Sequence, residues 1–91
     1  MDLAIIEDRI AVAERRFRRA CEQIVHLNYR LSGLERRYAK SKREQQRTFR
    51  YSLRLRMAVV DGLRDVYYEF AHKQAKESAI LKSLLEKIRN Q

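Results

Sequence analysis

Apolar residues recur at alternating steps of three and four over the first forty residues of the chain. This spacing is the heptad pattern of a coiled-coil helix, whose first and fourth residues face a partner. It predicts a first helix over about residues 2–40, in phase across Gly33; a break at Ser32-Gly33, with Ser32 and Glu35 as a capping box, is the alternative. The residues of this first seam are Leu3, Ile6, Ile10, Ala13, Phe17, Ala20, Ile24, Leu27, Leu31, Leu34 and Tyr38.

A second apolar pattern with helical spacing follows a polar interruption. The interruption predicts a tip over about residues 41–47, and the second pattern predicts a helix over about residues 48–90. Its apolar face is wider than a two-stranded seam requires, which indicates burial against more than one neighbouring helix. Its central residues are Phe49, Leu53, Met57, Val60, Leu63, Tyr67, Phe70, Gln74, Leu81, Leu84 and Ile88.

The two patterns match each other when they are paired antiparallel. Leu34 then meets Leu53, Phe17 meets Phe70, and the polar core position of Gln74 falls opposite Ala13. The fold class is therefore all-α, with residues 1–91 forming one domain, a long antiparallel helical hairpin of coiled-coil type. An antiparallel dimer of continuous rods makes the same contacts and stays open as the alternative.

The wide face of the second helix predicts that two hairpins dimerise into a four-helix bundle. Expected interface residues are Val59, Leu63, Val66, Tyr67, Phe70, Leu81, Leu84 and Leu85.

Positive charge is concentrated in the middle of the chain. The net charge is +9, and residues 37–56 contain eight basic side chains against a single acid, Glu44, so that segment alone contributes +7. Two such segments would repel each other in a rod dimer, whereas each is a solvated tip in a hairpin, which favours the hairpin. The candidate polyanion-binding residues are Arg37, Lys40, Lys42, Arg43, Arg47, Arg50, Arg54 and Arg56.

The segment from Phe49 to Met57 also alternates apolar and polar residues, as a strand does. A helical stretch over residues 58–71 follows, and Ser78 is placed to cap another helix. This order, with SLRLR in the strand, resembles the ribbon-helix-helix family of DNA-binding dimers. The resemblance covers about the last forty residues and implies a two-stranded ribbon in the major groove, with Arg50, Ser52 and Arg54 reading bases.

Candidate catalytic or metal-binding chemistry is sparse. Glu69 and His72 have the spacing of a di-iron half-site, but the helical pattern points both outward, and no second ligand pair exists for a zinc site. Because no phosphate loop, nucleophile elbow or carboxylate cleft is visible, we expect a non-enzyme without catalytic residues, cofactor or metal. The single Cys21 excludes an internal disulfide, which favours an intracellular location, cytoplasmic or nuclear.

Three functions fit these patterns. The first is a coiled-coil assembly or adaptor module that binds itself or another helical protein, with the basic patch facing an acidic partner. The second is a nucleic-acid-binding protein in which residues 37–56 contact phosphates and Tyr38, Phe49 and Tyr51 stack on bases. The third, ranked below both, is a module that binds an anionic membrane surface. Solvation of an exposed helix is the functionless explanation of the same charge.

Overall fold

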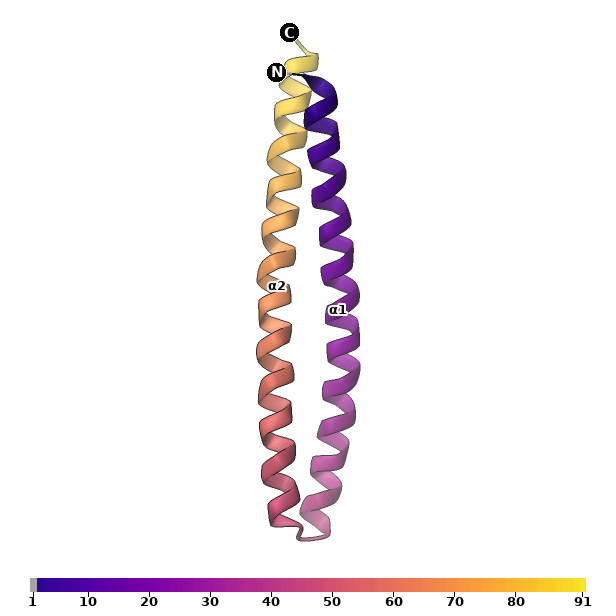
Figure 1. The fold of residues 1–91 in the computed structure, drawn as a ribbon, viewed down its shortest axis with the longest axis vertical. Coiled ribbons are helices and arrows are strands. Elements are labelled where there is room, and N and C mark those ends of the chain that lie inside the picture. The colour runs from indigo at the N-terminus through magenta and orange to yellow at the C-terminus, as the bar shows by residue number, and fades with distance from the viewer. Residues whose placement is uncertain (1) are drawn as a thin grey trace.

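The chain folds into two long helices joined by a tight turn. A computed structural model describes residues 2–91, with α1 spanning Leu3–Arg43 and α2 spanning Arg47–Arg89. The helices run antiparallel and form a rod of 69 × 15 × 14 Å, with the turn at one end and the start of α1 beside the end of α2 at the other (Figure 1). The predicted all-α helical hairpin is confirmed, while its dimerisation stays a prediction.

Local signals at its two ends explain the length of α1. The Asp2 side chain caps the helix by accepting a hydrogen bond from the Ala4 N–H at 3.0 Å. Lys40, Lys42 and Arg43 occupy the last turn, where positive charge opposes the negative end of the helix dipole. The helix runs through Ser32-Gly33, so the alternative of a break there is wrong.

The turn is shorter than the predicted tip of residues 41–47. It consists of Glu44, Gln45 and Gln46, and Gln45 adopts a left-handed conformation with φ of 56°. The Gln46 N–H donates to the Ser41 carbonyl at 3.0 Å, which closes the turn. The helix extends past residue 40 because Ser41, a polar residue at a seam position, is buried with its hydroxyl donating to the Tyr38 carbonyl at 2.7 Å.

The core is a narrow line of side chains between α1 and α2, divided into three clusters. Nearest the turn, Leu27 and Leu34 of α1 pack with Leu53 and Val60 of α2. The second cluster contains two alanines, Ala20 and Ala71, together with Ile24, and Tyr67 packs against it. At the open end the cluster contains Ile6, Ile10 and Leu85.

The face of α2 that packs on α1 is rotated from the predicted one. Phe70, which the predicted pairing placed opposite Phe17, remains exposed, as do Phe17 and Leu63. The observed seam instead alternates steps of four and three without a break, which lets one line of α2 follow α1 over its whole length. Its residues are Leu53, Met57, Val60, Arg64, Tyr67, Ala71, Gln74, Ser78, Leu81, Leu85 and Ile88.

This rotation buries polar side chains in the seam. Gln74 and Ser78 are buried, and the Gln74 Oε1 has no hydrogen-bond partner within residues 2–91. An unpartnered buried amide oxygen costs about 1–3 kcal/mol. The prediction that Gln74 occupies a core position is confirmed. The larger apolar residues Leu63 and Phe70 lie on another face of α2.

The alternative of a ribbon-helix-helix fold is wrong, because the segment predicted as its strand is helical. Residues 49–57 lie inside α2, and residues 2–91 contain no strand. Ser78 is in the middle of the same helix and caps nothing. The chain also reverses at residues 44–46, so the contacts between α1 and α2 form within one chain rather than between continuous rods. Neither helix, within residues 2–91, carries an apolar stretch long enough to span a lipid bilayer.

Candidate functional site

One long side of the hairpin is held closed by polar contacts between the helices. Glu7 and Glu14, seven residues apart on α1, form ion pairs of 2.6 and 2.7 Å with Arg89 and Lys82, which are seven residues apart on α2. Further along this side the Arg64 guanidinium donates to the Asn28 side-chain oxygen at 3.0 Å. We call this side the paired flank.

These contacts are consistent with the register of the buried seam and contribute little to the stability of the fold. Both ion pairs are exposed, and such pairs contribute about 0–1 kcal/mol. The hydrogen bond and charge of Lys82 hold the pKa of Glu14 below its ordinary value. Arg64 also pairs with Asp61 on its own helix, so the guanidinium is fixed between two partners.

The opposite side, which we call the open flank, presents apolar side chains of α2 to solvent. Val59, Leu63, Val66 and Phe70 follow each other at steps of four, three and four, and are 63%, 43%, 59% and 40% exposed. This spacing places them on one helix face, adjacent to the seam but outside it. We call the six exposed large apolar residues of this face the α2 stripe: Phe49, Val59, Leu63, Val66, Phe70 and Ile80.

Basic residues of α1 border the α2 stripe across the open flank. Positions spaced by seven lie almost on one line of a helix, and this line of α1 reads Arg9, Arg16, Gln23, Arg30 and Arg37. The corresponding line of α2 reads Phe49, Arg56, Leu63, Phe70, Glu77 and Leu84. None of these arginines forms an ion pair with residues 2–91, in contrast to Lys82 and Arg89 of the paired flank.

Two depressions show that both helices contribute to the surface of the open flank. The one nearer the turn has a volume of about 470 Å³ and is lined by Tyr29, Arg30, Gly33, Leu34, Arg37 and Arg56. The other has a volume of about 480 Å³ and is lined by Arg19, Ala20, Glu22, Gln23, Tyr67 and Phe70. The open flank is therefore a shallow groove, with an apolar wall on α2 and a basic wall on α1.

Nothing in the hairpin itself requires glycine at the floor of the first depression. A Cβ added to Gly33 would meet no side chain or other helix within 4 Å, and the φ of Gly33 is not positive. Glycine in a helix interior costs about 1 kcal/mol relative to alanine. The missing side chain does deepen the depression between Arg30 and Arg37.

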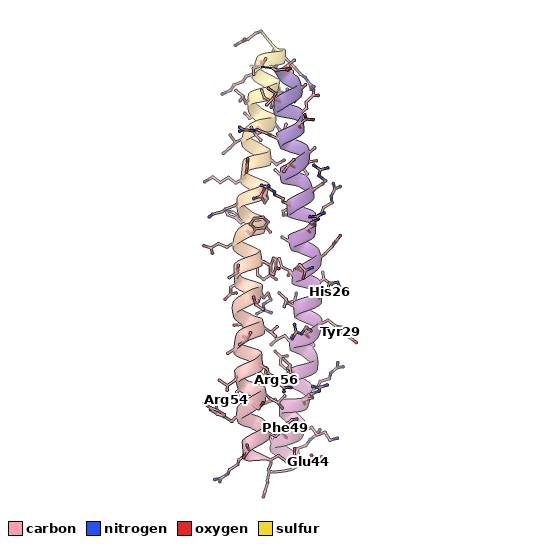
Figure 2. All side chains as sticks on the ribbon, viewed as in Figure 1. His26, Tyr29, Glu44, Phe49, Arg54 and Arg56 are labelled. Atoms are coloured by element: carbon pink, nitrogen blue, oxygen red, sulfur yellow. The ribbon has the colours of Figure 1, made fainter. Side chains whose placement is uncertain are left out.

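The predicted polyanion-binding residues do not form one patch. Seven of them are exposed and Arg50 is half-buried, but α1 and α2 carry them around the whole tip. Arg37 and Arg56 belong to the open flank, whereas Arg47, Arg50 and Arg54 line a separate hollow of about 310 Å³ with Tyr38 and Tyr51. Figure 2 shows Arg54 and Arg56 leaving α2 on different sides, above Phe49 and the turn residue Glu44.

Two of the basic tip residues have partners within the tip. The Lys40 ammonium lies 3.9 Å from the Glu44 carboxylate, and both side chains are largely in solvent. The Lys42 ammonium lies 4.9 Å from the centre of the Tyr38 ring, a cation–π contact. Arg43 is exposed at the end of α1.

The eight predicted interface residues divide between two surfaces. Val59, Leu63, Val66 and Phe70 belong to the α2 stripe and are exposed. The other four contribute to packing inside the hairpin: Tyr67, Leu81, Leu84 and Leu85. The sequence reasoning missed Arg16 and Arg30, since it looked for charge density along the chain rather than for charge repeated every seven residues.

Residues 2–91 contain no group of three or more His, Cys, Asp or Glu side chains placed to hold a metal ion. Cys21 is a free, half-buried thiol.

Comparisons of this chain with protein-family models, with curated proteins and with solved structures find no match.

Proposed function

We propose that this chain is a non-enzymatic coiled-coil module that assembles with other helices through the open flank. The observation that supports this proposal is the α2 stripe. Its four central residues have the spacing of a helix–helix seam, but α1 is already packed against the neighbouring face of α2. A contiguous exposed apolar face of this kind marks an interaction surface in soluble proteins.

Packing another helix against the stripe would give α2 a second neighbour, as in a helical bundle. The partner is a second copy of the chain, giving the four-helix bundle expected from the sequence, or another helical protein. The basic residues bordering the stripe would then face an acidic part of that partner. We place this activity inside the cell, in the cytoplasm or nucleus, because a single cysteine suits a reducing compartment.

Sedimentation equilibrium of Leu63→Ser/Phe70→Ser tests this proposal. Both residues are exposed, so the variant keeps the helical content of the wild type but loses assembly, with itself or with an added helical partner. The matched control is Val25→Ser/Leu55→Ser, which removes exposed apolar side chains from other faces of α1 and α2. Equal assembly by the wild type and both variants would remove the α2 stripe as the interface.

A second candidate function is nucleic-acid binding at the tip. The supporting observation is the hollow where Arg47, Arg50 and Arg54 meet the rings of Tyr38 and Tyr51, which combines charge with stacking surfaces. The test is a salt titration of fluorescence anisotropy with labelled duplex DNA and single-stranded RNA. For a binder of duplex DNA, the logarithm of the affinity falls by about 0.9 for each phosphate contacted when the salt concentration rises tenfold. Binding of an anionic vesicle but of neither nucleic acid would instead support the membrane-surface function.

A further inference from the structure

We infer that the occupant of the open flank is an acidic amphipathic helix of another protein, lying along the hairpin with apolar side chains on the α2 stripe and carboxylates on Arg30, Arg37 and Arg56. This inference rests on the proposed function, because it names the partner of the same surface. It follows from the shape of the flank, from its charge and from the contrast with the paired flank.

The shape of the open flank fits one helix. Its two depressions lie one after the other along the boundary between α1 and α2, and each takes residues from both helices. The span from Arg16 and Phe70 to Arg37 and Phe49 covers about three heptads, or roughly 30 Å at 1.5 Å per residue. A partner of about twenty-one helical residues fills this length. Its apolar side chains would pack against Leu63 and Phe70 on the α2 stripe.

The charge of the flank selects acidic side chains. Over those three heptads the facing lines of α1 and α2 contain Arg16, Arg30, Arg37 and Arg56 and no acid, and Glu22 is the one acid that lines either depression. On the paired flank the equivalent basic residues Lys82 and Arg89 have Glu14 and Glu7 as partners on α1. The arginines of the open flank stand at positions where coiled coils place interhelical ion pairs, and their missing partners are carboxylates of a third helix.

The same charge disfavours a second copy of the chain. A two-fold interface brings one surface against itself, so the arginine lines of both copies would lie in one contact. Glu22 lines the second depression and Glu77 lies on the α2 line beyond Phe70, but these two acids face four arginines in each copy, and like charges across an interface act against association. An acidic helix from a different chain would bury the α2 stripe and neutralise the arginines at the same time.

The experiment uses two synthetic peptides of four heptads, identical except at the positions that flank the seam. Both have Leu and Ile at the seam positions; one has Glu and the other has Lys at the flanking positions. The wild-type chain is expected to bind the Glu peptide at least 100-fold more tightly than the Lys peptide in isothermal titration at physiological salt. The variant Arg30→Glu/Arg37→Glu/Arg56→Glu is expected to reverse this preference.

The matched control separates binding in the open flank from general attraction between the basic chain and the acidic peptide. Arg36→Glu/Arg43→Glu/Arg54→Glu changes net charge by the same amount at exposed positions outside the open flank, and its preference for the Glu peptide is expected to change less than fivefold. Equal losses in the two triple variants would overturn the inference, since the attraction would then depend on net charge alone. Circular dichroism confirms that each variant is folded before titration.

Two outcomes distinguish failure of this inference from failure of the proposed function. If the wild type ignores the Glu peptide but forms a dimer that Leu63→Ser/Phe70→Ser dissolves, the α2 stripe is an assembly surface whose occupant is a second copy, and the inference is wrong. If the wild type neither binds the Glu peptide nor self-associates, the inference and the proposed function both fail. Displacement of the Glu peptide by duplex DNA at physiological salt would also overturn the inference, because the arginines would then be a phosphate site.

Discussion

A comparison of Leu53→Ala with Leu55→Ala tests the packing of the hairpin at its most informative position. The two residues stand two apart in the segment that alternates apolar and polar side chains. In a strand they would share one face, whereas in a helix they point about 200° apart. Leu53 is 0% exposed in the cluster of Leu27, Leu34 and Val60, and Leu55 is 52% exposed on the outside of α2.

The expected magnitudes follow from this difference in burial. Replacing a fully buried leucine by alanine costs about 2–5 kcal/mol, and we take about 3 kcal/mol for Leu53, because the side chains around it belong to only two helices. Replacing Leu55 costs less than about 0.5 kcal/mol, since the side chain is already in water and alanine is a better helix former. A chain of this length has a stability of about 5–13 kcal/mol, so both variants remain folded.

Urea denaturation followed by circular dichroism measures both changes. With a urea m-value of about 1.5 kcal/mol/M, Leu53→Ala lowers the midpoint by about 2 M and Leu55→Ala leaves it within about 0.3 M of the wild type. Protein concentration is held constant across the series, so that any association affects all samples equally. Similar losses in the two variants would refute the helical register, and a loss below about 1 kcal/mol for Leu53→Ala would refute its place in the core.

Three further predictions concern the seam, the paired flank and the turn. Gln74→Leu is expected to raise stability by about 1–2 kcal/mol in the same urea assay, since it removes a buried oxygen without a hydrogen-bond partner; a destabilised variant would show that the amide has a partner in solution. Because Lys82 lowers the pKa of Glu14, the stabilising contribution of this carboxylate is complete above its ordinary pKa of about 4.3 and is lost as pH falls through the lowered value. Glu14→Gln should therefore lower stability at neutral pH and converge with the wild type in acid, and a difference independent of pH would contradict the ion pair. Insertion of Gly-Gly after Gln45 is expected to cost less than about 1 kcal/mol, because it extends a solvated turn, whereas loss of folding would show that the chain is not a hairpin in solution.

The first helix could be predicted from the sequence almost completely, because its apolar residues form one narrow line. Each heptad of α1 offers a single face to bury, and the structure buries that face from Ile6 to Leu34 except at Phe17, which is exposed, and Leu31, which is half-buried. The end of α1 was harder to locate. Ser41 is polar, but its hydroxyl bonds to its own backbone, so it can occupy the seam and prolong the helix past the predicted limit.

The face of α2 could not be predicted in the same way, because that helix has two apolar lines. One contains Leu63 and Phe70, and the other contains Ala71 and Leu85 among polar residues. Side-chain size favoured the first line, while the unbroken repeat of four and three favoured the second, which packs on α1. The same ambiguity predicts a second contact surface, since the larger residues need another neighbour.

The candidate site was only partly predictable from linear charge density. The run of basic residues around the turn is visible in the sequence, but the helices distribute it over several sides of the tip. Arg16 and Arg30 lie far from that run in sequence and join Arg37 and Arg56 only because positions spaced by seven align on a helix. Their lack of ion-pair partners is a property of the packed hairpin.

The central claim is that the open flank is where this chain meets another helix, and a methyl-resolved NMR titration tests it most directly. The methyl groups of Val59, Leu63 and Val66 report on the α2 stripe, and those of Val25 and Leu55 report on exposed positions elsewhere. Addition of the Glu peptide is predicted to shift the three stripe residues and leave the other two unchanged. Shifts at Val25 and Leu55 with an unperturbed α2 stripe would contradict the account, because the contact would then lie outside the open flank.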